Sequence, residues 1–175
     1  ENRFNVDLDG IEYDAKFVFS RVGYNLEGNE LGAAFGLTQL KKLSDNIKVR
    51  QLNFKRQVDF FSKYPQFFIN PQETELSETA WLAFPIQLKE NIPFSRKELM
   101  IFLEKRNIQT RVVFTGNINR QPGFININKV VVKEGYPNAD YVMRNGILLP
   151  LHHGLNEEMF AKLHSTIELF LSKYI

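Results

Sequence analysis

A chain of 175 residues is long enough for one domain, or for one domain with a substantial extension, and it can bury a real core. Its 22 basic and 20 acidic residues leave a net charge of +2, which does not indicate a nucleic-acid or acidic-membrane partner. The absence of cysteine excludes a disulfide framework, a thiolate metal site and a cysteine nucleophile, and it is compatible with a cytoplasmic protein.

The start of the chain carries no targeting signal. It opens with Glu1 rather than Met, without a signal-peptide pattern, and no apolar run approaches the length of a membrane span. We therefore expect no membrane partner, and we expect an internal piece of a longer protein or a trimmed version of one.

The first predicted element is a β-hairpin. In "FNVDLDGIEYDAKFVFSRV" apolar and polar residues alternate on both sides of Asp9-Gly10, a dipeptide that tolerates the positive φ of a tight turn. The hairpin and the loop after it, residues 1–28, form the first predicted part of the chain.

A long amphipathic helix is predicted from Asn29 to about Tyr64, with Asn29 as its N-cap. Ser44-Asp45 is a candidate point for a kink or a restart. Small residues at its start let another backbone approach closely, either from the same chain or from a partner subunit. With the polar linker "NPQETELSETA", this helix forms a predicted connecting region, residues 29–78.

Residues 79–175 show the pattern of a small α/β domain. "WLAFPIQLK" is a predicted strand, and Pro85 in it indicates an edge position or a bulge. Ser95 and Glu98 form a capping box at the start of a helix, with Phe94 and Leu99 as the hydrophobic staple. "IQTRVVF" is predicted as a full strand that alternates from Ile108 to Phe114.

The C-terminal part adds a short helix over 138–145 that Gly146 stops, a strand "ILLPL", and a last helix capped by Asn156. The buried side of this last helix is predicted to consist of Met159, Phe160, Leu163, Ile167, Phe170 and Leu171. The order β-α-β-loop-helix-β-α predicts an α/β (α+β) domain, with a largely antiparallel sheet covered on one face by two helices.

Polar side chains gather after the strand in "TRVVFTGNINRQPGF". Gly116 permits a turn, Asn117 offers an amide, and Arg111 and Arg120 carry planar forks suited to carboxylate or phosphate. An anion pocket is one interpretation. The alternative is a polar loop held together by its own side chains.

A second polar group precedes the long helix. Gly23, Tyr24 and Asn25 place a hinge, a hydroxylated ring and an amide near a helix N-terminus, where phosphate binds favourably. The residues by themselves favour ordinary helix-entry chemistry over a binding site.

No self-sufficient catalytic set or metal site is predicted. His152 and His153 are adjacent on a strand and point to opposite faces, and no further ligand stands at a suitable spacing. His164 is expected at the margin of the packed face of its helix. The sixteen phenylalanines are interpreted as core, since no strand interleaves aromatic and basic residues as an RNA-binding sheet does.

The segment "YDAKFVFSRVGYNLEGNELGAAFGLTQLKKL" resembles the passage from the large to the small domain in the DegT/DnrJ/StrS family of pyridoxal-phosphate sugar-nucleotide enzymes. "FPIQLK", "IQTRVVFTGNINRQPGF" and "NADYVMRNGILLPLHHGL" are similar to the rest of that small domain. The spacing of Thr-Arg, Gly-Asn and Arg-Gln-Pro is most similar to the branch with sugar 3-dehydratases, with aminotransferases close by.

The resemblance implies the aspartate-aminotransferase type of fold and a homodimer whose active sites draw residues from both subunits. It implies that Asn25 reaches the phosphate of pyridoxal phosphate bound in the partner subunit. Arg111, Asn117 and Arg120 are implied to line the pocket for a nucleotide-linked sugar, and Tyr24 and Phe114 are further substrate-binding candidates.

The family's Schiff-base lysine, or the histidine that replaces it in 3-dehydratases, is expected before Glu1, and Lys16 is no substitute. This chain alone is therefore predicted to lack a catalytic residue and to bind no cofactor.

The choice between an aminotransferase and a 3-dehydratase remains open at this point. The competing hypothesis is a stand-alone, non-catalytic α/β module that binds a small anion or a protein. Gly28 departs from the family pattern, in which many members have a bulkier residue or proline at this position, so the shape of the local loop stays open.

Overall fold

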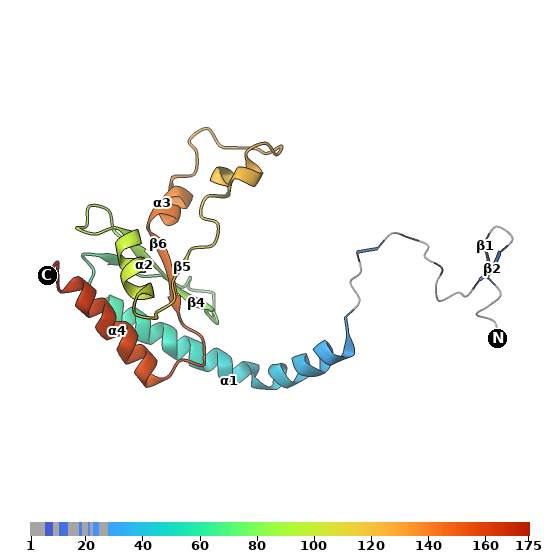
Figure 1. The fold of residues 1–175 in the computed structure, drawn as a ribbon, viewed down its shortest axis with the longest axis horizontal. Helices are drawn as coiled ribbons and strands as arrows, with labels where there is room; N and C mark the ends of the chain where they lie inside the picture. The colour runs from blue at the N-terminus through green and yellow to red at the C-terminus, as the bar shows by residue number, and fades with distance from the viewer. Residues whose placement is uncertain (1–5, 9–10, 14–17, 19–20, 22, 25–27) are drawn as a thin grey trace. The chain divides into compact units, whose positions relative to one another are not determined.

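The structure, a computed structural model, describes residues 6–8, 11–13, 18, 21, 23–24 and 28–175. The chain divides into two compact units, Glu1–Lys41 and Lys42–Ile175, and the boundary lies inside one helix. Figure 1 labels the elements. The three-part division expected from the sequence stays a prediction.

A hairpin lies in the first unit. Strands β1 (Val6–Leu8) and β2 (Ile11–Tyr13) pair antiparallel, with Leu8 opposite Ile11. The predicted hairpin is confirmed, whereas its turn, Asp9-Gly10, lies outside the described residues.

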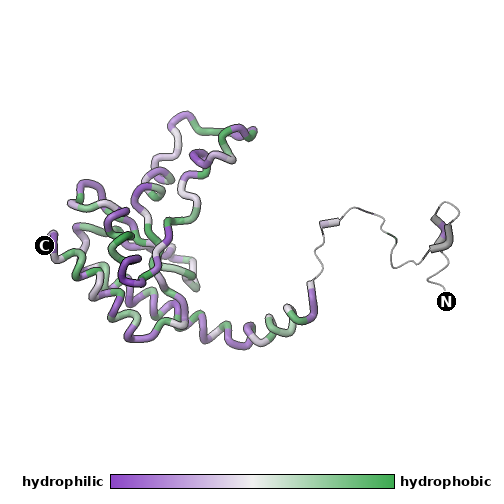
Figure 2. Tube along the Cα trace, in the orientation of Figure 1, coloured by the Kyte–Doolittle hydropathy of each residue, from purple (hydrophilic) through white to green (hydrophobic). Residues whose placement is uncertain are grey.

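Helix α1 (Glu30–Phe61) is one uninterrupted helix of 32 residues. The Asn29 side chain accepts a hydrogen bond from the Gly32 amide at 2.6 Å, so the predicted N-cap is confirmed. The helix continues through Ser44-Asp45 without the restart that the sequence suggested. Hydrophobic and hydrophilic residues alternate along its first half (Figure 2), and the most exposed apolar side chains there are Leu31, Phe35, Leu37 and Leu40.

The second unit is built on a four-stranded antiparallel sheet. Its strands are β3 (Phe68–Ile69), β4 (Ala83–Leu88), β5 (Arg111–Val112) and β6 (Gly146–Pro150), in the order β3-β4-β6-β5. The predicted antiparallel sheet is confirmed, with β3 as a short strand that the sequence analysis did not predict.

The edge position or bulge predicted for the strand with Pro85 is wrong, because β4 lies between β3 and β6 and pairs with β6 in an unbroken register from Ala83 to Gln87. The sheet still accommodates the proline. β3 reaches only Gln87 and Leu88, so Pro85 has no strand opposite it on that side within the described chain. On the other side it lies opposite Leu148 of β6.

Three helices follow the strands: α2 (Arg96–Glu104), α3 (Pro137–Asn145) and α4 (Glu157–Leu171). α2 packs against α4 and β6, while α3 contacts β4 and β6 (Figure 1). One hydrophobic cluster contains alternate residues of β4 and β6 together with residues of α2, α4 and the end of α1. Two helices were predicted to cover the sheet, so α1 is a third. Its members include Phe60, Phe61, Phe84, Ile86, Leu99, Leu103, Ile147, Leu149, Leu163 and Ile167.

The predicted helix starts are confirmed. The Ser95 side chain accepts from the Glu98 amide, while the Glu98 carboxylate accepts from the Ser95 amide at 2.7 Å. The Asn156 side chain accepts from the amide of Met159 at 2.9 Å. Phe94 belongs to the buried core, as expected for a staple residue.

The strand predicted over 108–114 is too long, because only Arg111–Val112 pairs with the sheet. The Thr110 amide donates to the carboxylate of Glu104 instead of to a strand. Phe114 adopts φ 48°, a left-handed conformation that ends extended backbone. The predicted alternation therefore does not continue to Phe114: Ile108 and Thr110 are buried, whereas Val112 and Phe114 are exposed.

One further expectation is wrong, and another is confirmed with a different geometry. Met159 is exposed rather than buried, because it stands in the first turn of α4, where its side chain lines a pocket. Gly146 ends α3 as expected but with φ −81°, and it begins β6 directly. A Cβ there would meet Val142 O at 2.7 Å and Val113 Cγ2 at 2.6 Å, so close approach, not a left-handed turn, requires the glycine.

Candidate functional site

The polar segment after β5 folds into two short 3₁₀ turns, η3 (Ile118–Arg120) and η4 (Pro122–Phe124). Asn117 caps η3, and its Oδ1 accepts from the Asn119 amide at 3.1 Å. Gln121 Nε2 donates to the carbonyl of Thr115 at 2.9 Å. These short-range bonds fix the segment as a compact loop.

The loop is joined to α3 through Asp140. Arg120 Nε donates to Asp140 Oδ1 at 2.5 Å and Arg120 Nη2 donates to Oδ2 at 2.6 Å, which makes a bidentate ion pair. Asn117 Nδ2 donates to Oδ1 at 2.7 Å. The structure thus brings the predicted residues Asn117 and Arg120 together, on a carboxylate of their own chain.

The electrostatics of this cluster follow from its hydrogen bonds. The bonds from Arg120 and then Asn117 hold the pKa of Asp140 well below its usual range, with the charge of nearby Arg144 acting in the same direction. The same pairing raises the pKa of Arg120. Both partners therefore stay ionised throughout the working range of an enzyme.

Arg111 lies in β5, opposite Leu148 of β6. Its Nη1 donates to the carbonyl of Thr110 at 3.0 Å, and the amide oxygen of Gln109, in the orientation that satisfies both groups, accepts from Nη2 at 2.6 Å. Glu104 accepts from the Thr110 amide at 2.6 Å, and this bond lowers the pKa of the carboxyl. α2 thereby anchors the backbone next to Arg111.

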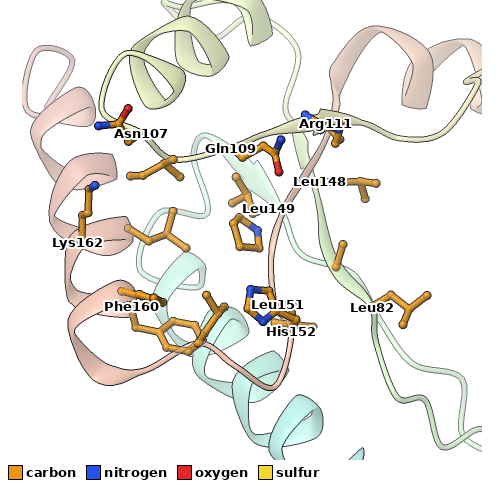
Figure 3. A pocket seen from close by; sticks show the side chains of 16 residues that line it. Leu82, Asn107, Gln109, Arg111, Leu148, Leu149, Leu151, His152, Phe160 and Lys162 are labelled. Carbon is orange, nitrogen blue, oxygen red and sulfur yellow. The ribbon is translucent and has the colours of Figure 1, made fainter. Parts of the chain in front are cut away.

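A pocket of about 490 Å³ opens beside Arg111, between β6, the segment before β5, and α4 (Figure 3). Apolar residues, chiefly leucines and Phe160, form most of its wall, while Asn107, Gln109, Arg111 and Lys162 stand along its rim. None of its described lining residues is a carboxylate. Its size and its cationic rim suit a small molecule with an anionic group.

The remaining predicted site residues do not join this arrangement. Tyr24 is 92% exposed and Phe114 is 87% exposed, although Phe114 borders a small cavity together with Gly116 and Gln121. Asn25 lies outside the described residues. The roles predicted for these three residues and for Arg111, Asn117 and Arg120 stay predictions.

Asp140 and Glu104 are the site residues that the sequence analysis missed. The segment from 110 to 124 contains two arginines and no carboxylate, so a counter-charge from another element was to be expected. That signal does not say which acidic residue supplies it, because the partner stands 20 residues further along the chain.

Neither a metal-binding cluster nor a membrane-spanning helix is found in the part of the chain that the structure describes. There, no cluster of three or more histidine or acidic side chains could hold a metal ion. His152 Nδ1 instead accepts from the amide of Gly154. No helix in the described segments combines the length and the apolar character that crossing a bilayer needs.

The comparison with protein families identifies the family of this chain. The model of the DegT/DnrJ/EryC1/StrS aminotransferase family matches residues 4–168. The chain belongs to this family. The polar loop, Asp140 and the pocket all lie within the matched range.

Curated relatives of this DegT/DnrJ/EryC1/StrS chain include sugar-modifying proteins. It is 36% identical to the lipopolysaccharide biosynthesis protein RfbH of Salmonella typhimurium over 96% of the chain and 39% of the relative. It is 34% identical to a dTDP-4-dehydro-2,6-dideoxy-D-glucose 3-dehydratase of Saccharopolyspora spinosa, over 92% of the chain and 34% of the relative. The chain thus spans between a third and two fifths of these relatives.

A solved structure of the family has the same fold. The E. coli GDP-4-keto-6-deoxy-D-mannose-3-dehydratase with bound hydrated pyridoxal phosphate superposes with a TM-score of 0.74 at 29% identity. The match covers 86% of this chain and 38% of that one. The predicted α/β fold of a pyridoxal-phosphate aminotransferase type is therefore confirmed.

Proposed function

We propose that this chain is the small-domain portion of a pyridoxal-phosphate-dependent sugar 3-dehydratase, acting on a nucleotide-linked 4-keto-deoxysugar in surface-polysaccharide or deoxysugar synthesis. One observation carries the choice: relatives named as 3-dehydratases reach 34% and 31% identity, whereas those named as transaminases reach 28% and 27%. A sugar aminotransferase of the same family is the second candidate. Both readings include a homodimer in the cytoplasm.

Arg111 and the pocket beside it carry the proposed contact with substrate. A nucleotide-linked sugar combines a dianionic diphosphate with a partly apolar sugar and base, and the pocket pairs leucine walls with a guanidinium and an ammonium group at its rim. Held by Gln109 and by the backbone of Thr110, Arg111 would bind the anion in one orientation.

The described residues do not by themselves fit pyridoxal phosphate. Arg111 and Arg120 each give only part of the guanidinium to acceptors of their own chain, and their remaining N–H groups are assigned here to the sugar nucleotide. Asn25, the proposed contact of the cofactor phosphate, lies outside the described part. Our proposal therefore assigns the rest of the cofactor site, including the Schiff-base residue or its replacement, to sequence not present in these 175 residues.

The test compares the full-length parent protein with residues 1–175. We expect the parent to show the visible absorbance of bound cofactor, and the shorter chain to show none. Incubated with GDP- or dTDP-linked 4-keto-6-deoxysugar, the parent should yield a product that has lost the 3-hydroxyl, which mass spectrometry distinguishes from a product that has gained an amino group. Amino transfer would establish the second candidate.

Arg111→Ala in the parent should raise KM for the sugar nucleotide about tenfold and leave cofactor absorbance intact. Asn25→Ala should instead weaken cofactor binding. Lys48→Ala, which removes an exposed ion pair with Asp45, is the control and should change neither quantity. A parent without cofactor absorbance, or tight cofactor binding by residues 1–175, would contradict the proposal and favour the non-catalytic binding module.

A further inference from the structure

The contact between Arg120 and Asp140 leaves part of the guanidinium free. The guanidinium has five N–H groups, and two of them, the one on Nε and one of the two on Nη2, donate to the carboxylate of Asp140. No other side-chain partner of Arg120 occurs among the described residues, and the side chain is 59% exposed. The Nη1–Nη2 edge, which has the fork geometry that binds carboxylate and phosphate, therefore remains available.

Asp140 itself is held firmly. Asn117, only 6% exposed, donates to the same carboxylate, and its own oxygen is used by the Asn119 amide. Both ends of this amide are thus satisfied inside the protein, which fixes the carboxylate relative to the loop. Asp140 cannot turn away from Arg120 without leaving the buried Asn117 amide unpaired.

The helix that carries Asp140 is anchored on both sides. Tyr141 of α3 donates its hydroxyl to the carbonyl of Leu88 in β4 at 2.8 Å, and Arg96 of α2 donates to the carbonyl of Met143. Gly116 of the loop packs on Met143, where a Cβ would lie 2.5 Å from the Met143 Cγ. Its φ of +62° adds a second requirement for glycine.

The charge at this point remains favourable for an anion. Asp140 neutralises one guanidinium, but Arg144 on the same helix acts electrostatically on Asp140 as well. Two arginines and one carboxylate leave a net charge of +1. A ligand phosphate therefore meets a cationic cluster in which one fork is already held in place.

We propose that Asp140 is a positioning residue for substrate binding: it aims the free edge of Arg120 at the diphosphate of the sugar nucleotide. This inference rests on the proposed function. The physical gain is preorganisation, because a long arginine side chain that is fixed before binding loses little conformational entropy when the anion arrives.

The experiment uses the full-length parent and measures both steady-state kinetics and the Kd of GDP and dTDP by calorimetry. Asp140→Asn removes the charge and one acceptor while keeping the size of the side chain. We expect KM for the sugar nucleotide and the Kd of the matching nucleotide to rise about tenfold, with kcat within about twofold and cofactor absorbance unchanged. Asp140→Glu should recover part of the loss.

A double-mutant cycle separates positioning from general structural support. If Asp140 acts through Arg120, then Asp140→Asn has no further effect on KM in an Arg120→Ala background. Additive effects, or a wild-type KM and Kd for Asp140→Asn, would overturn the inference. Glu157→Gln, which breaks the ion pair of Arg56 at 2.7 Å, is the matched control and should leave KM unchanged.

Two further arms keep the result decisive. Should Asp140→Asn fail to fold, Arg120→Lys tests the same idea, because it keeps the charge and loses the fork; an unchanged nucleotide Kd there overturns the inference. A parent that binds nucleotide but does not turn over the sugar contradicts the proposed function only. A parent that turns it over with a normal KM in Asp140→Asn contradicts the role of Asp140 only.

Discussion

His164 lies where α1, α4 and β6 meet. Its ring stacks on Phe60 with the ring centroids 3.8 Å apart, and its Nε2 lies 2.9 Å from Gln57 Oε1. Gln57 Nε2 donates to the carbonyl of Pro150 at 3.3 Å, so Gln57 Oε1 is the acceptor and His164 carries its proton on Nε2. The expectation that His164 stands at the margin of the packed face is confirmed by its partial burial.

Burial lowers the pKa of His164 from 6.5 to about 4, with the charges of Arg56 and Lys63 as smaller causes. A folded-state pKa below the unfolded value means that the unfolded chain binds the proton more readily. The stability is therefore complete above pH 6.5 and is lost as the pH falls towards 4. Because the ring is partly solvated, we expect a loss of about 1–2 kcal/mol between pH 7 and pH 4.5.

Urea unfolding of the chain at pH 7 and pH 4.5 measures this effect, with His164→Gln as the comparison. The variant keeps a polar group near Gln57 but cannot titrate, so its free energy of unfolding should change less between the two pH values. The carboxyl groups with lowered pKa, Glu98, Glu104 and Asp140, contribute mainly at lower pH. An identical pH dependence in both proteins would show that His164 is not the group responsible.

Among the elements, those defined by neighbouring residues could be predicted from the sequence. The caps at Asn29, Ser95 and Asn156 each involve an amide three residues further on, so the signal lies within one turn. Strand limits could not be predicted in the same way. Strand β5 is short because Glu104 takes the Thr110 amide, a competition that the alternating pattern of the strand does not reveal.

The capping box of α2 gives a prediction for one element. Ser95→Ala removes the side-chain oxygen that accepts from the Glu98 amide at 3.2 Å, and it leaves that helix-terminal amide unpaired. We expect a loss of about 1 kcal/mol in the free energy of unfolding, measured by urea titration.

Ser165→Ala is the matched control for the same chemical change inside a helix. Ser165 is exposed on α4, and its hydroxyl donates to the carbonyl of Lys162 within the helix. Because alanine has the higher helix propensity, this variant should be as stable as the wild type or slightly more stable. Equal losses in the two variants would argue against a capping role for Ser95.

At the scale of the whole molecule, the candidate site was only partly accessible from the sequence. The spacing of Asn117 and Arg120 in one polar segment indicated that they lie close together, and both contact Asp140. It did not reveal their shared carboxylate, because Asp140 belongs to a different helix and meets them only through tertiary folding. Arg111 has different partners, Gln109 and the Thr110 backbone, so one common anion for all three residues stays a prediction.

The two halves of helix α1 differ in how far the rest of the chain covers their side chains. All residues from 30 to 45 are exposed, whereas Asn53, Gln57, Phe60 and Phe61 are buried in the second unit. A solvated helix of that length is marginally stable on its own. In residues 1–175, backbone amides in the first half of α1 should therefore exchange with deuterium within seconds, and those near Phe60 only through global unfolding.

In the full-length parent we expect the exchange in the first half of α1 to slow at least tenfold, because additional protein surface would cover Leu31, Phe35 and Leu40. Mass spectrometry of peptides from this segment measures the difference, with peptides from α4 as the internal reference. Equally fast exchange in both proteins would show that these side chains stay in water. Deuterium uptake by one helix can thus report whether the protein is assembled, without any assay of catalysis.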